Sequence, residues 1–113
     1  MSRFAEATDV SVEKSRAEIE KLLMRYGADQ FMSGWRDKAA MVAFRAQGRH
    51  LRFLLPLPSK DDPEFKKRGA PNQYQPGGVP TQDQQMRRWE QACRQRWRAL
   101  CLCIKAKLEA LLG

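Results

Sequence analysis

Apolar residues recur with helical spacing near the start of the chain. They lie three or four positions apart and share one helical face, which consists of Ile19, Leu22, Leu23 and Tyr26. Ser11 is a residue type that caps helix N-termini, and Gly27 suits the left-handed conformation in which helices end. The pattern predicts a helix over residues 11–26.

The next segment alternates with period two, which is typical of β-strands. It predicts strands over residues 29–36, 39–46 and 49–55, joined by tight turns at Asp37-Lys38 and at Gln47-Gly48. If each hairpin has a two-residue turn, the strand over residues 39–46, which both hairpins share, presents the same side chains to one face of the sheet in both pairings. The facing pairs are Trp35 with Ala40, Ser33 with Val42, Phe31 with Phe44, Phe44 with Leu51, and Val42 with Phe53. This agreement fixes the register, because a one-residue slip would invert every side chain.

The opposite face of the predicted sheet is small, partly apolar and basic, and we expect no acidic residue on it. Its members are Gln30, Met32, Gly34, Arg36, Met41, Ala43, Arg45, His50, Arg52 and Leu54. The sequence leaves open whether a helix covers this face. Its four basic side chains, Arg36, Arg45, Arg52 and His50, form a candidate binding patch.

All six prolines lie in residues 56–80, and we expect this Pro/Gly-rich loop to be mobile. Thr81 or Asp83 can then cap a final helix whose apolar stripe runs to the end of the chain. At 1.5 Å per residue this helix is about 45 Å long, more than a three-stranded sheet covers. We therefore expect part of the stripe to meet a second copy, and the candidate dimer seam is Leu100, Ile104, Leu108 and Leu111. The predicted fold is a single α+β domain over residues 1–113, with the order αβββα.

Charge is distributed unevenly. The first 26 residues carry five basic and five acidic side chains, so the whole net charge of +8 lies after them. On the final helix, Arg87, Arg94, Arg98 and Lys105 fall within about 20° of one line and form a basic ridge. Such a ridge suits a phosphate backbone or an acidic protein.

Catalytic and metal-binding patterns are not evident. His50 is the only histidine and has no carboxylate to orient it, and the acids at 61, 62 and 64 suit a solvated turn. Cys93, Cys101 and Cys103 fall within one predicted helix, where we expect reduced thiols. We expect no enzyme, metal or cofactor. The chain has no apolar run of membrane-spanning length and its N-terminus has no apolar secretion signal, so we expect a cytoplasmic protein.

Two resemblances add context. The predicted element order is similar to that of the double-stranded RNA-binding domain, whose second helix begins with phosphate-binding lysines, whereas residues 81–85 contain none. Residues 15–28 and 97–110, with the sheet between them, resemble short uncharacterised proteins of tailed-phage and prophage genomes, which continue beyond the end of this chain. That resemblance implies a phage setting and the host cytoplasm, and it assigns no site.

Two hypotheses follow. The first is a small phage-derived protein that binds DNA or RNA through phosphate contacts, without strong sequence specificity. The alternative is a non-enzymatic inhibitor of a host defence nucleic-acid enzyme, like an anti-CRISPR protein, that docks on an acidic host protein. Self-association through the C-terminal helix is compatible with both.

Overall fold

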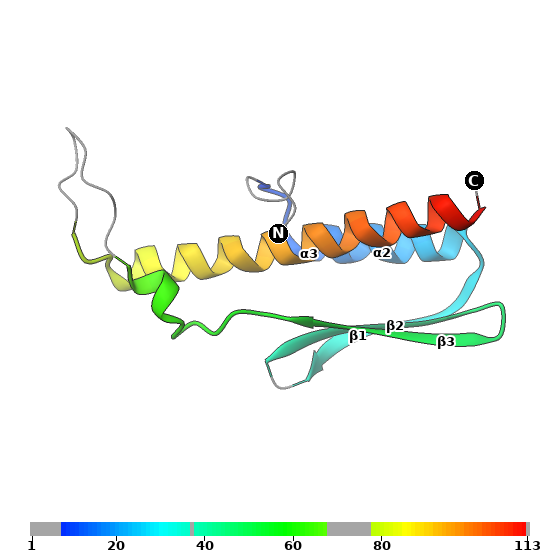
Figure 1. Cartoon of the computed structure of the whole chain (residues 1–113), viewed down its shortest axis with the longest axis horizontal. Coiled ribbons are helices and arrows are strands. Elements are labelled where there is room, and N and C mark those ends of the chain that lie inside the picture. The colour runs from blue at the N-terminus through cyan, green and yellow to red at the C-terminus, as the bar shows by residue number, and fades with distance from the viewer. Residues whose placement is uncertain (1–7, 37, 68–77, 113) are drawn as a thin grey trace.

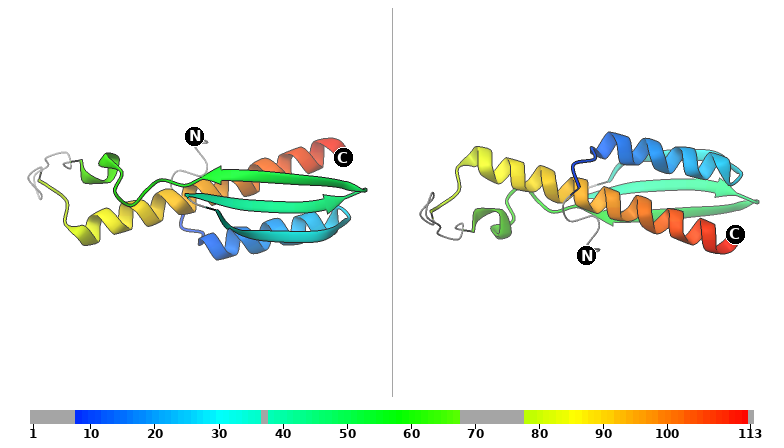
Figure 2. Two further views of the ribbon diagram at one scale, coloured as in Figure 1. Left: turned by 90° about the horizontal axis from the view of Figure 1, so that it is seen from below. Right: turned by 90° about the horizontal axis from the view of Figure 1, so that it is seen from above.

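A computed structural model describes residues 8–36, 38–67 and 78–112, with only the backbone described for Arg36, Leu111 and Leu112. The elements in chain order are α2 (Val12–Arg25), β1 (Ala28–Arg36), β2 (Ala39–Ala46), β3 (Arg49–Pro56), a short 3₁₀ helix η1 (Pro63–Lys66) and α3 (Gln82–Leu112). This order confirms the predicted αβββα arrangement of an α+β fold. Both long helices lie on one side of the sheet, and no helix or strand of the described residues covers the other side, called the bare face below (Figures 1 and 2).

The strands form an antiparallel meander in the order β1-β2-β3, with the predicted register across both hairpins. The turn between β2 and β3 has positive φ at both residues, 54° at Gln47 and 75° at Gly48. Two such residues match the right-handed twist of the strands that they join. β2 is therefore held on both sides, and its Ala40, Val42 and Phe44 are buried against the helices.

One irregularity alters the predicted faces. The register between β1 and β2 shifts between Ala28 and Gln30, which is a β-bulge at Asp29. Asp29 consequently pairs with Arg45, which lies on the bare face of the sheet. The expectation that this face carries no acid is therefore wrong.

The core lies between the two helices and the sheet. α2 contributes Ile19 and Leu23, and α3 contributes Trp97, Cys101 and Ile104. Ser11 caps α2 as predicted, since its hydroxyl accepts a hydrogen bond from the Lys14 N–H at 3.1 Å. The α2 helix ends before Gly27, whose φ is +94°.

The long helix α3 reaches the sheet with its C-terminal part, and its first turns extend beyond the sheet (Figure 1). There η1 packs against it with the buried side chain of Phe65, so residues 63–66 are anchored. Arg88 Nη1 donates to the carbonyls of Phe65 at 3.2 Å and Lys67 at 2.8 Å. Residues 68–77 of the loop predicted to be mobile lie outside the described residues.

The predicted dimer seam is occupied by contacts within the chain. Ile104 is buried in the core, and Leu100 and Leu108 pack against that core. The side chain of Leu111 lies outside the described atoms. The expectation that this end of the helix overhangs is wrong, because the overhanging end is the N-terminal one. Homodimer formation stays a prediction that would need another surface.

One buried polar atom gives a stability prediction. Ser15 is 0% exposed, and its Oγ has no hydrogen-bond partner among the described residues. Such an atom loses its water without compensation, and alanine is also the better helix former. We expect Ser15→Ala to raise the free energy of unfolding by about 1 kcal/mol, measured by urea denaturation. A loss of stability would show that this hydroxyl is satisfied; Ser11→Ala, which removes the cap, should destabilise by about 1 kcal/mol.

Candidate functional site

The basic ridge predicted on α3 is interrupted by contacts within the chain. Arg98 forms an ion pair with Glu18 of α2. Arg94 donates from Nε and Nη2 to Oε1 of Gln91, at 2.9 and 2.6 Å. Arg94 and Arg98 are half-buried, whereas Arg87 and Lys105 at the two ends of the ridge are exposed and lie about 27 Å apart along the helix. The middle part of the ridge contacts α2 through Arg98, so the ridge is not a continuous line of free cations.

Other arginines of α3 also hold the fold together. Arg96 Nη1 donates to the carbonyl of Pro56 at 3.3 Å, where β3 ends. With Arg88 on η1 and Arg98 on α2, the helix uses arginines to hold three neighbouring segments. A guanidinium suits this task because it presents several donors in a fixed plane.

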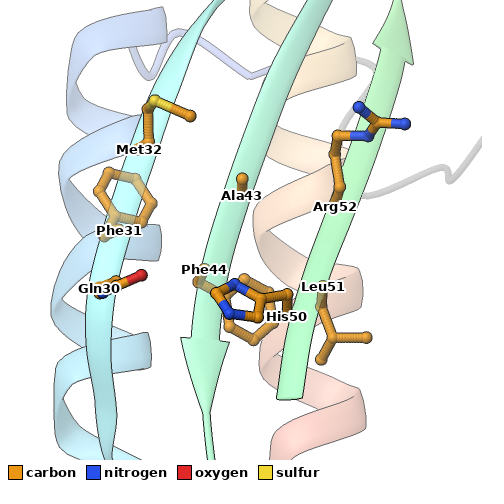
Figure 3. Close-up of a pocket in the computed structure, with 8 residues that line it drawn as sticks. All are labelled: Gln30, Phe31, Met32, Ala43, Phe44, His50, Leu51 and Arg52. Carbon is orange, nitrogen blue, oxygen red and sulfur yellow. The ribbon is translucent and has the colours of Figure 1, made fainter. Parts of the chain in front are cut away.

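The bare sheet face carries the second predicted patch, and Figure 3 shows part of it. The register forms three rows across the strands: Gln30-Arg45-His50, Met32-Ala43-Arg52 and Gly34-Met41-Leu54. Met32 is 58% and Leu54 53% exposed, and His50 and Arg52 are also exposed. A shallow hollow of about 530 Å³ lies over the first two rows. The nine residues of these rows, together with Asp29, are called the open sheet face below.

The charge on the open sheet face is partly cancelled. Arg45 donates from Nε to Oδ1 of Asp29 at 2.9 Å and from Nη2 to Oδ2. This hydrogen bonding lowers the pKa of the Asp29 carboxyl and raises the pKa of Arg45. Among the described side chains, Arg52 and His50 are the basic groups on this face without an ion-pair partner.

The sequence analysis missed a third surface, centred on Trp35. The alternation places Trp35 on the inward face, yet its side chain is 72% exposed. Its ring stands at the end of the sheet where α2 begins, and it lines a hollow of about 310 Å³ together with Val12, Trp89 and Trp97. A second hollow of about 270 Å³ shares Trp35, Leu57 and Trp89 with the first.

This second hollow is bordered by two lysines. It is lined by Trp35, Lys38, Leu57, Pro58, Ser59, Lys60, Asp61 and Trp89, which are called the tryptophan groove below. Lys60 Nζ lies 4.7 Å from the centroid of the Trp89 ring, a cation–π distance. Trp89 Nε1 donates to the Pro58 carbonyl at 2.7 Å, and Leu57 N donates to the Lys38 carbonyl at 3.0 Å. These bonds fix the groove walls, whereas no described residue forms a hydrogen bond with the Trp35 ring.

The remaining candidate groups have structural explanations. Two of the acids near residue 62 belong to η1, since Asp62 Oδ1 accepts from the Glu64 N–H at 2.9 Å as a helix cap, whereas Asp61 lines the tryptophan groove. Burial raises the pKa of the Cys93 and Cys101 thiols, while Cys103 is exposed. Within the described ranges, no three His, Cys, Asp or Glu side chains gather as a metal site. None of the helices in this part of the chain is long and apolar enough to cross a membrane.

Comparison with known proteins adds no relative: no family model, curated protein or solved structure matches this chain.

Proposed function

We propose that the chain is a non-enzymatic protein that binds single-stranded nucleic acid, DNA or RNA, in the tryptophan groove. The observation that carries this proposal is the 72% exposure of Trp35 in a groove that Lys38 and Lys60 also line, together with one acid, Asp61. Leaving an indole ring in water forgoes one of the largest hydrophobic gains available to a side chain. An exposed ring in a groove lined by two lysines is a combination that can stack a base and contact its phosphates.

The overall charge supports the same partner. The chain carries +8, and two ion pairs form among the described residues, those of Arg45 and Arg98. Most of the positive charge is therefore not cancelled by neighbouring carboxylates, and it attracts a polyanion from a distance. This revises the site predicted from the sequence, because the contacts move from the α3 ridge to the end of the sheet.

The size of the groove favours an unpaired strand. Only an unstacked base can lay its face on a tryptophan ring, and a hollow of about 270 Å³ accepts a base rather than a duplex. Stacking tolerates every base, and phosphate contacts read no sequence. The proposal therefore includes weak sequence specificity.

A salt titration tests the proposal. The affinity for a labelled single-stranded oligonucleotide should fall as salt rises, with log K changing by about 0.7 per log unit for each phosphate neutralised. Replacing both Lys38 and Lys60 by Gln should reduce that slope by about 1.4, because two contacts are removed. Fluorescence anisotropy measures both quantities, and a duplex of the same sequence should bind more weakly.

The matched control changes two exposed basic residues in the C-terminal half of α2, Lys21 and Arg25, to Gln. It removes the same charge far from the groove, so the slope should change much less. The proposal is wrong if the protein binds no single strand at low salt. It is also wrong if the α2 control reduces the slope as much as the groove variant does.

A further inference from the structure

The open sheet face is an apolar surface that no part of the described chain covers. Both long helices pack on the opposite side, which Figure 2 shows from below and from above. Met32 and Leu54 are more than half exposed, and Met41 and Ala43 lie between them on the central strand. Methionine side chains are flexible and adapt to differently shaped partners. Contiguous exposed apolar surface of this kind marks interaction sites in soluble proteins.

Gly34 is an independent sign that the face serves contact. A glycine inside a strand is destabilising relative to alanine, and it has no side chain to pack. Here neither geometry nor crowding requires it: its φ is outside the left-handed region, and an added Cβ would meet nothing within 4 Å. Its effect is to leave the β1 backbone uncovered beside Met41, so that a partner can approach closely.

The charges on the face indicate the chemistry of the partner. Asp29 is paired with Arg45. The described basic side chains that stay available for a partner are Arg52 and His50, both on the edge strand β3. A partner with a carboxylate at that position would be complementary. A second copy of this chain would bring another surface of the same sign, which disfavours a symmetric pair.

The chemistry of the face also distinguishes protein from nucleic acid. None of its outward side chains is a Trp, Tyr or Phe on which a base could stack. The two phenylalanines that line its hollow, Phe31 and Phe44, belong to the helix-covered face, where Phe44 is buried and Phe31 packs against the core. The centre of the open sheet face is formed by Met and Leu. Apolar centres with an arginine at the rim are typical of protein–protein interfaces. We propose that the open sheet face docks a protein whose contact surface has an apolar centre and an Asp or Glu placed against Arg52.

This inference does not rest on the proposed nucleic-acid function, because the tryptophan groove and the open sheet face share no residue. A random peptide library selected on the full chain is the probe. We expect enriched peptides to combine apolar residues with Asp or Glu. Their binding should weaken at least about tenfold in Arg52→Glu and in Gly34→Glu, because each places a negative charge in the docking surface.

Arg49→Glu is the matched control, since it makes the same charge change on the same strand at a position that alternates to the other face. It should change peptide binding less than about twofold. Thermal denaturation checks that each variant folds, and Arg52→Gln replaces Arg52→Glu if the latter does not. Met32→Ser removes an exposed apolar side chain from the same face without changing the charge, so it should weaken peptide binding and leave binding of the single-stranded oligonucleotide unaffected. This variant separates a failure of this inference from a failure of the proposed function.

Three outcomes would overturn the inference. Enriched peptides without acidic residues, or peptides that bind Arg52→Glu as well as the parent protein, would remove the charge argument. Loss of oligonucleotide binding in Met32→Ser would assign the face to nucleic acid instead. A concentration-dependent dimer in analytical ultracentrifugation that Arg52→Glu dissociates would assign it to a second copy of the chain.

Discussion

Replacing Trp97 by Ala should lower the free energy of unfolding by about 3–5 kcal/mol. Trp97 is 4% exposed and belongs to the cluster in which α3, α2 and β2 meet. The substitution removes the hydrophobic burial of a large ring. It also leaves a cavity that the surrounding helices and strand cannot fill by moving inward. Because a domain of this size is stable by only about 5–15 kcal/mol, much of the stability would be lost.

Urea denaturation followed by circular dichroism measures this change, and the melting temperature should fall by roughly 10–20 °C. Trp35→Ala is the control, because it truncates the same residue type at an exposed position. It should alter the free energy of unfolding by less than about 0.5 kcal/mol. Equal losses in the two variants would contradict the burial that separates these tryptophans.

The sheet was predictable because two local signals agree. The alternation fixes which residues share a face, and the turn at Gln47-Gly48 fixes the length of the second hairpin. Together they place Val42 opposite Ser33 and Phe53, as the structure has it. Helix α2 was predictable for a similar reason, because its N-cap residue and the spacing of its apolar residues are both local features of the sequence.

The composition of the open sheet face was only partly predictable. A β-bulge adds one residue to a strand, and the alternation of residues around Asp29 does not indicate the bulge. The bulge moves an acid onto a face that otherwise reads as purely basic. One local irregularity therefore changed the charge of a candidate site without changing the fold.

The contacts of the α3 arginines could not be predicted from helical periodicity. A period of 3.6 residues shows that Arg94 and Arg98 share a line, but it does not show which neighbour that line faces. Glu18 lies 80 residues earlier in the chain. Only the packing of α2 beside α3 brings the two together, and that packing depends on the whole core.

The exposure of Trp35 depends on where the helices begin and end. The alternation correctly places it opposite Ala40, which is buried. α2 begins at Val12, at the end of the sheet where Trp35 stands, and α3 crosses this region with Trp89. No helical turn closes over the ring. A sequence pattern predicts on which face of the sheet a residue lies, whereas the extent of the helices over that face decides whether the side chain is buried.

This exposed ring carries the last prediction. Trp35→Ala should weaken binding of a single-stranded oligonucleotide by about 1–3 kcal/mol, which is roughly 5- to 150-fold in the dissociation constant. The loss should appear in the dissociation constant and not in the salt slope, because a stacking contact neutralises no phosphate. Anisotropy titrations of the parent and the variant at two salt concentrations measure both.

The controls follow from the aromatic character of the contact. Trp35→Phe keeps a smaller π-face and should recover part of the affinity. Met24→Ala truncates another exposed apolar side chain, on α2 and outside the groove, and should leave the affinity unchanged. If Trp35→Phe binds no better than Trp35→Ala, the ring acts by bulk or not at all. The positive charge would then be the whole basis of binding, and a second, non-stacking surface would have to be sought among the exposed lysines.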